Sequence, residues 1–144
     1  MPVEIDPKTA HARLQSEPGA VYLDVRSVME FEQGHPTGAW NIPILHATPS
    51  GMKPNEAFVK VASATLPKDA LVVIGCKSGQ RSAMACQALA QVGFTNVVNL
   101  AGGFLGHADM FGRVQSPGWT QCDLPATMEP TPGKAWEDLR PQAP

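Results

Sequence analysis

Short runs of β-branched and aromatic residues alternate with segments of helical periodicity along this chain of 144 residues. The run at 71–74 is wholly apolar and mostly β-branched, which is typical of a buried parallel strand. We predict strands at 3–5, 21–25, 40–42, 71–74 and 97–100. We predict helices at 7–16, 28–33 and 82–92, with one more beginning near Asn55. This alternation predicts an α/β fold, with a mainly parallel central sheet of about five strands and helices on both faces.

Capping residues define several of the expected helix starts. Asp6 followed by Pro7 predicts one start, because proline suits the first helical position. Asn55 is a candidate cap for the third helix. The apolar face of that helix consists of Phe58, Val61, Ala62 and Leu66. Ser82 is the expected cap of the helix that follows the 71–74 strand, and residues 43–53 are expected to form a loop.

The composition changes at Pro125. Five prolines stand in the last twenty residues, and large apolar side chains are few there. Such a composition is typical of an extended segment without a core of its own. We therefore predict one domain over residues 1–124 and a loose, proline-rich tail over 125–144, in which Trp136 offers the one aromatic anchor to the domain.

Charge and cysteine content exclude several function classes. A net charge of −2 provides no basic footprint, so we expect no direct nucleic-acid ligand. No apolar stretch approaches membrane-spanning length, and the N-terminal residues lack the basic and apolar regions of a secretory signal. Three widely spaced cysteines argue against a disulfide framework, and none has zinc-site spacing. We expect a cytoplasmic protein that uses no metal and no cofactor.

The segment 75–81, Gly-Cys-Lys-Ser-Gly-Gln-Arg, carries the most informative chemistry. It connects an expected strand to an expected helix, at the edge of the sheet where open α/β folds bind ligands. Backbone N–H groups in such a loop, together with the helix N-terminus, attract an anion. Lys77 and Arg81 add positive charge. These effects favour a thiolate at Cys76, which therefore becomes the candidate nucleophile.

Four segments in a fixed order resemble the rhodanese-like sulfurtransferases, in particular their small single-domain members of the thiosulfate sulfurtransferase type. The matching segments are Cys76–Ser82, Leu23–Arg26 with Glu30-Phe31, Gly34-His35 with Gly38–Pro43, and Asn99–Phe104. Together they extend the resemblance over roughly residues 3–124. The chain departs from the common pattern at Pro36 and Thr37, and also where an apparent insertion occupies residues 109–117. That insertion is expected to form part of the rim of the site.

The resemblance implies transfer of a sulfane sulfur through a Cys76 persulfide. Thiosulfate or a related donor would supply the sulfur, and cyanide in vitro or a thiol in the cell would accept it; a protein acceptor is also possible. Lys77, Ser78, Gly79, Gln80 and Arg81 would form the substrate-binding loop. Gly79 is expected to supply a positive φ or a close backbone approach. Family members that prefer 3-mercaptopyruvate resemble Cys-Gly-Ser-Gly in this loop, so Lys77 favours thiosulfate.

Several assignments stay open at this stage. Lys77 either contacts the anion or is simply exposed, and Arg81 either faces the loop or pairs with a structural carboxylate. Asp24 and Arg26 are expected to support the site by ion pairing. His35 is expected to stabilise a turn more than to donate a hydrogen bond near the site. The remaining cysteines have no expected role: Cys86 is predicted to be a small buried apolar residue, and Cys122 could be exposed.

Two other function classes share this cysteine loop. A phosphatase or arsenate reductase would use Cys-x5-Arg, whereas Cys76 to Arg81 is Cys-x4-Arg, one residue shorter. The tighter ring suits a single sulfur atom better than a tetrahedral oxyanion. A persulfide carrier or partner-binding module would retain the same cysteine, so that alternative remains.

Overall fold

The central sheet contains five strands that pair in parallel in the order β1-β8-β7-β2-β4. The computed structural model describes residues 2–143. In the order of the sheet, its strands are β1 (Glu4–Ile5), β8 (Val97–Leu100), β7 (Val72–Gly75), β2 (Val21–Asp24) and β4 (Trp40–Asn41). The predicted α/β fold with a mainly parallel sheet of about five strands is confirmed.

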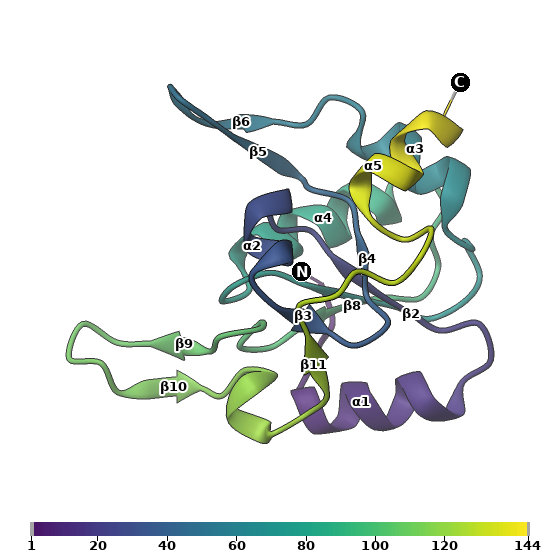
Figure 1. Ribbon diagram of the computed structural model, residues 1–144. Coiled ribbons are helices and arrows are strands. Elements are labelled where there is room, and N and C mark those ends of the chain that lie inside the picture. The colour runs from purple at the N-terminus through teal and green to yellow at the C-terminus, as the bar shows by residue number, and fades with distance from the viewer. Residues whose placement is uncertain (1, 144) are drawn as a thin grey trace.

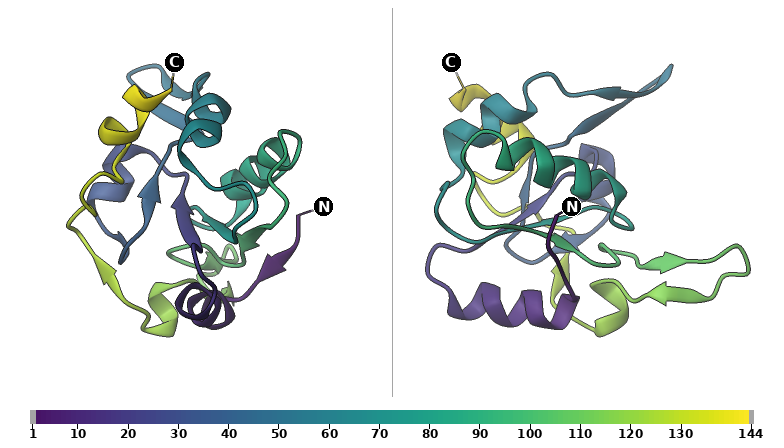
Figure 2. Two further views of the ribbon diagram at one scale, coloured as in Figure 1. Left: turned by 90° about the vertical axis from the view of Figure 1, so that its right-hand side faces the viewer. Right: turned by 180° about the vertical axis from the view of Figure 1, so that it is seen from behind.

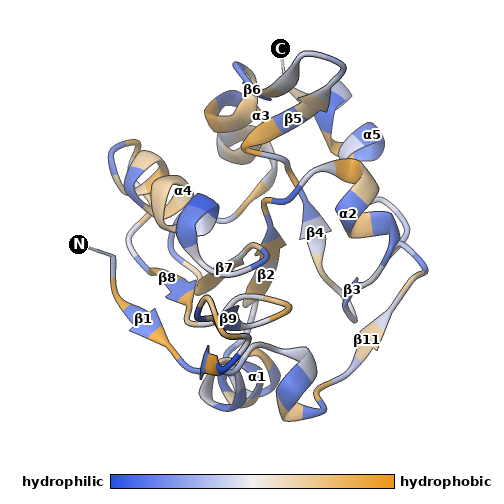
Figure 3. Cartoon of the chain, turned by 90° about the vertical axis from the view of Figure 1, so that its left-hand side faces the viewer, coloured by the Kyte–Doolittle hydropathy of each residue, from blue (hydrophilic) through white to orange (hydrophobic). Residues whose placement is uncertain are grey.

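Helices cover both faces of this sheet (Figures 1 and 2). They are α1 (Pro7–Ser16), α2 (Val28–Glu32), α3 (Phe58–Thr65), α4 (Gln80–Ala90) and α5 (Trp136–Leu139), with 3-10 turns η1 (Thr120–Cys122) and η2 (Arg140–Gln142). Figure 3 shows β2 and β7 enclosed between α4 on one side and α1 on the other. None of the helices within residues 2–143 has the length and apolar character that crossing a membrane requires.

Alternation along the strands divides the core into two layers. Leu23 and Ile74 point to the layer beneath α3 and α4, whereas Tyr22 and Val73 point to the layer that contains α1. Successive strand residues face opposite sides of a sheet, so a strand covered on both faces is apolar throughout. The four residues of the predicted apolar face of α3, from Phe58 to Leu66, are all buried.

Two predicted boundaries need correction. Residues 43–53 do not form a plain loop: β5 (Leu45–Thr48) and β6 (Gly51–Pro54) make an antiparallel hairpin. Its turn is Pro49-Ser50, and Gly51 directly after the turn has φ of +109°. Because β6 is exposed on every residue, it has no apolar face by which its sequence could signal a strand. Ser82 is not a helix cap, since α4 begins at Gln80 and Gly79 occupies the capping position.

The C-terminal segment is packed on the domain, in contrast to the loose tail that its composition predicted. β11 (Ala126–Thr127) pairs antiparallel with β3 (His35–Pro36). Farther along, the Lys134 carbonyl oxygen accepts a hydrogen bond from the Asn41 backbone, and Leu139 is buried in the core. Trp136, the predicted anchor, is half-buried and packs against the same core. Backbone hydrogen bonds and these apolar side chains therefore hold a segment whose average composition is polar.

The insertion near residues 109–117 forms a second hairpin. β9 (His107–Ala108) and β10 (Val114–Ser116) pair antiparallel and project away from the body of the molecule (Figures 1 and 2). The β5–β6 hairpin projects on the same side, and α2 lies between the two.

Candidate active site

Cys76 lies in the loop between β7 and α4, as the sequence predicted. Its side chain is only 2% exposed, and the backbone N–H of Gly79 donates a hydrogen bond to Cys76 Sγ at 3.1 Å. Gly79 has φ of +123°, a conformation that side-chain-bearing residues rarely adopt, so the predicted need for glycine is met. The loop therefore curls its backbone donor toward the sulfur, an arrangement that stabilises negative charge there.

A buried polar group lies beside the sulfur on its helix side. Ser82 Oγ is 3.3 Å from Cys76 Sγ and also bonds to Gly79 O and Asn99 Oδ1. Asn99 Nδ2 in turn donates to Gly79 O at 3.2 Å. Ser82 and Asn99 thus fix the loop backbone by donating to the carbonyl oxygen of Gly79. The sequence indicated both residues only as members of the matching segments, and it predicted a helix-capping role for Ser82.

The segment after β8 closes the loop from the other side. Phe104 N donates to Cys76 O at 2.7 Å, and Leu105 N donates to Lys77 O at 3.1 Å. A Cβ atom at Gly103 would approach Cys76 O to 2.5 Å, so only glycine permits this contact. These hydrogen bonds hold the carbonyl oxygens of Cys76 and Lys77 away from the thiol, where their negative partial charge would repel an anion.

Arg81 faces a carboxylate rather than the interior of the loop. Its Nη1 and Nη2 atoms bond to the two oxygens of Glu30 at 2.6 and 2.9 Å. This pair lowers the pKa of Glu30 to about 2, chiefly through the hydrogen bond from Arg81. Of the two alternatives that the sequence left open, the structure shows the structural ion pair. Nothing in the sequence singled out Glu30, 51 positions away, as the partner.

Asp24 and Arg26 form a buried ion pair next to the loop. Arg26 Nη2 lies 2.6 Å from Asp24 Oδ2 and also donates to Gly34 O. Its guanidinium carbon lies 4.6 Å from the centre of the Phe104 ring. Arg26 therefore holds together β2, the turn after α2 and the segment that closes the cysteine loop, an arrangement that suits a supporting role.

Lys77, directly after Cys76 in the loop, is exposed. It lines a cleft of about 310 Å³ together with Arg26, Glu30, Gln33, Gly34, Phe104 and Leu105. Within residues 2–143, the ion pairs are Arg13–Glu17, Arg26–Asp24 and Arg81–Glu30, and none involves Lys77. Of the other predicted loop residues, Ser78 is half-buried and Gln80 is exposed at the first position of α4.

The other singled-out residues lie outside the loop. His35 is fully buried, stacked on Phe31, with its ring nitrogens 2.7 Å from Phe31 O and 2.9 Å from Glu129 O, which places it in the support of a turn and of the C-terminal segment. Cys86 is buried in the core, and burial raises the pKa of its thiol to about 12. Cys122 is half-buried in η1.

The arrangement combines a nucleophilic atom with a backbone donor and a neighbouring free cation. Such a site can attack an electrophilic sulfur and hold the resulting anion. Among residues 2–143, no group of three or more His, Cys, Asp or Glu side chains gathers where it could hold a metal ion.

Known proteins are similar to the part of this chain that contains the cysteine loop. The family model described as "Rhodanese-like domain" matches residues 6–109. "Rhodanese-like domain-containing protein 15, chloroplastic" from Arabidopsis thaliana is 39% identical over 114 residues, which cover 79% of this chain and 56% of that protein. The chain thus spans little more than half the length of that relative.

A shorter relative and a solved structure are covered more completely. "Thiosulfate sulfurtransferase 16, chloroplastic" from Arabidopsis thaliana is 38% identical over 104 residues, covering 72% of this chain and 85% of that protein. The crystal structure of Rv0390 from M. tuberculosis superposes with a TM-score of 0.74 at 28% identity. This match covers 88% of this chain and 97% of that one.

Proposed function

Because the chain belongs to the rhodanese-like sulfurtransferase family, we propose that it transfers sulfane sulfur from thiosulfate, or a related anionic donor, to a thiophilic acceptor through Cys76. The observation that carries this proposal is the hydrogen bond from Gly79 N to Cys76 Sγ in a loop between β7 and α4. That donor stabilises negative charge on Sγ before the thiolate attacks. It does so again when Sγ is released as a thiolate on discharge of the persulfide.

The first half-reaction forms the persulfide. Cys76 Sγ, as a thiolate, attacks the outer sulfur of thiosulfate, and an Sγ–S bond forms. The S–S bond of thiosulfate breaks at the same time, and its electron pair leaves with sulfite. The exposed ammonium of Lys77 supports binding of the dianion at the mouth, whereas Arg81, already paired with Glu30, acts by positioning the loop.

The second half-reaction regenerates the enzyme. An acceptor nucleophile, cyanide in vitro or a thiolate in the cell, attacks the outer sulfur of the persulfide. The S–S bond breaks, and the electron pair returns to Cys76 Sγ. Two separate half-reactions imply ping-pong kinetics. We also propose a reducing compartment such as the cytosol, since Cys76, Cys86 and Cys122 are all free thiols.

Intact mass spectrometry tests this proposal. After incubation with thiosulfate and removal of the excess, the protein should gain the mass of one sulfur atom, and Cys76→Ser should gain none. Addition of cyanide should remove the extra mass and release thiocyanate. A protein that forms the persulfide but cannot pass sulfur to cyanide or to small thiols would instead be a carrier dedicated to a partner.

A further inference from the structure

The β9–β10 hairpin presents apolar side chains to solvent. Met110 is 89% exposed and Phe111 is 77% exposed, the highest values among the large apolar residues of the described chain. The turn that carries them is well bonded: Asp109 Oδ1 accepts from the backbone N–H groups of Phe111 and Arg113, and Asp109 Oδ2 accepts from Gln115. An ordered turn that displays large apolar side chains is typical of an interaction surface.

This hairpin begins at the cysteine loop. Leu105, which is 45% exposed, donates its backbone N–H to Lys77 O immediately before β9. The β5–β6 hairpin and α2 project on the same side of the molecule (Figures 1 and 2). A partner that rests on the β9–β10 hairpin therefore lies next to the segment that closes the cysteine loop.

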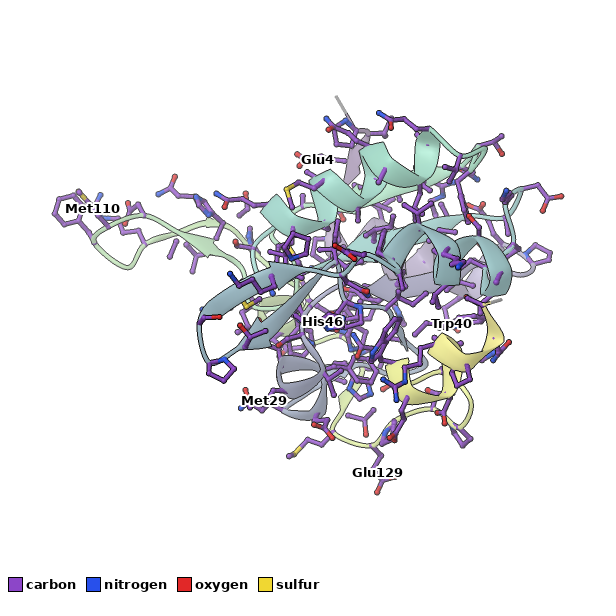
Figure 4. All side chains as sticks on the ribbon, turned by 90° about the horizontal axis from the view of Figure 1, so that it is seen from above. Glu4, Met29, Trp40, His46, Met110 and Glu129 are labelled. Carbon is purple, nitrogen blue, oxygen red and sulfur yellow. The ribbon has the colours of Figure 1, made fainter. Side chains whose placement is uncertain are left out.

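Two further methionines are exposed on elements of the same side of the molecule. Met29 on α2 is 65% exposed, and Met52 on β6 is 45% exposed. Figure 4 shows Met29 and Met110 on the side of the molecule to which the two hairpins extend. Methionine side chains are flexible and polarisable, and they adapt to varied apolar partners. We call Leu105, Met110 and Phe111, together with Met29 and Met52, the docking surface.

The charges around the docking surface select an acidic partner. Lys53 on β6, Lys77 in the loop and Arg113 on β10 are exposed, and none belongs to the ion pairs of residues 2–143. Two of the three acidic groups on the same elements are already engaged: Glu30 pairs with Arg81, and Asp109 bonds within its turn. Glu32 on α2 is exposed and belongs to none of the ion pairs of residues 2–143, so the three cations outnumber this one carboxylate.

We propose that the docking surface binds a protein sulfur acceptor whose cysteine lies on an extended segment with apolar and acidic neighbours. This inference rests on the proposed function. Because Cys76 is only 2% exposed, a flat protein surface cannot bring its thiol to Sγ, whereas a protruding extended segment is narrow enough to reach it. The acceptor thiolate attacks the outer sulfur of the Cys76 persulfide, the S–S bond breaks, its electron pair returns to Cys76 Sγ, and the acceptor leaves as the persulfide.

Two synthetic peptides test the proposal. One has a single cysteine flanked by leucines and aspartates, and the other replaces each aspartate by lysine. The rate at which each peptide removes sulfur from the preformed persulfide is followed by intact mass. The variants are Met110→Ser with Phe111→Ser on the hairpin, and Met128→Ser, a matched control that is 68% exposed near β11.

The acidic peptide should discharge the persulfide about tenfold faster than the basic one. The hairpin double variant should lose most of that advantage while reacting with cyanide at the unaltered rate, and Met128→Ser should behave like the original protein. Equal rates for the two peptides, or an unaffected double variant, would overturn the inference while leaving the proposed function intact.

A binding measurement separates the docking surface from the chemistry. A fluorescent acidic peptide with serine in place of its cysteine should bind the original protein, and the hairpin double variant should weaken binding about tenfold or more. This measurement does not depend on sulfur transfer, so it stands even if no persulfide forms. Sedimentation of the protein alone completes the test: self-association abolished by the double variant would make a second copy of the chain the occupant, and would overturn the inference.

Discussion

The Arg81 guanidinium forms a bidentate ion pair with the Glu30 carboxylate, with hydrogen bonds of 2.6 and 2.9 Å. Glu30 has a second task, because its Oε1 also accepts from the backbone N–H of Ser27 in the capping box of α2. One carboxylate thus stabilises the start of α2 and fixes the first turn of α4, directly after the cysteine loop. This pairing is consistent with the positioning role proposed for Arg81.

Breaking this pair should lower the free energy of unfolding. We expect Arg81→Ala to lose about 1–2 kcal/mol, because the guanidinium and the carboxylate are both partly buried. Arg81→Lys should lose less, since lysine keeps the charge but not the bidentate geometry. Urea unfolding of Arg81→Ala, Glu30→Gln and the double variant measures the coupling. Strictly additive losses would show that the two residues do not interact in solution.

Stability should fall in acid because of the same carboxylate. The pKa of Glu30 is lowered from 4.5 to about 2, principally by its hydrogen bond with Arg81. A depressed folded-state pKa contributes stability that is complete above about pH 4.5 and is lost as the pH falls toward 2. We expect this contribution to be about 2 kcal/mol, after allowance for partial exposure. Urea midpoints measured from pH 6 down to pH 2.5 should fall less steeply for Glu30→Gln than for the original protein.

Gly103 should tolerate no side chain. A Cβ atom there would lie 2.5 Å from Cys76 O and 2.6 Å from Lys77 O, and φ is +60°. Gly103→Ala should therefore displace the cysteine loop, reducing both the unfolding free energy and the rate of persulfide formation. Gly112→Ala is the matched control, because φ is +80° but nothing lies within 4 Å. It should lose only about 1 kcal/mol of strain and keep its activity. Similar losses in both variants would contradict the close contact.

Local pattern predicted much of the fold and of the loop. Strands β2, β7 and β8 are covered on both faces, so most of their buried residues are apolar, a pattern that a sequence displays directly. Asp24 and Asn99 are the buried polar exceptions in β2 and β8. The placement of Cys76 followed from the strand before it and the helix after it. Glycine at position 79 predicted a positive φ or a close backbone approach, and the positive φ is what the structure shows.

The remaining features depend on contacts that are distant in sequence. Glu30 and Arg81 are 51 positions apart, so no local pattern joins them. Strand β6 of the β5–β6 hairpin is exposed on every residue, so alternation cannot reveal it. Backbone hydrogen bonds hold the C-terminal segment, and Leu139 is the one fully buried side chain in its described part. The average composition of the segment conceals both features.

Cys86 and Cys122 should be dispensable for sulfur transfer. Burial and the nearby charge of Cys76 raise the pKa of Cys86 to about 12, so its thiol stays protonated and unreactive near neutral pH. Iodoacetamide followed by peptide mass mapping should label Cys76 and leave Cys86 unmodified. A Cys86→Ala, Cys122→Ala double variant should still form the persulfide and transfer its sulfur to cyanide. If the persulfide formed but could not be discharged, one of these cysteines would be a resolving thiol.

Lys77 should determine the preference for the sulfur donor. Its exposed ammonium is outside every ion pair of residues 2–143 and lies at the mouth of the cleft beside the loop. We expect kcat/KM to be higher for thiosulfate than for 3-mercaptopyruvate. Lys77→Gly should lower the thiosulfate value about fivefold, mainly through KM, because a charge contact acts on the bound anion and the transition state alike.

Salt and a distant lysine provide the controls for this donor preference. Added salt should weaken thiosulfate turnover of the original protein more than that of Lys77→Gly, since a solvent-exposed charge contact is screened. Lys8→Gln, which removes an exposed charge on α1, should leave both donors unaffected. Equal or better turnover of 3-mercaptopyruvate by the original protein would refute the role of Lys77, because a loop selected for an anionic thiosulfate cannot also favour the donor that uncharged loops prefer.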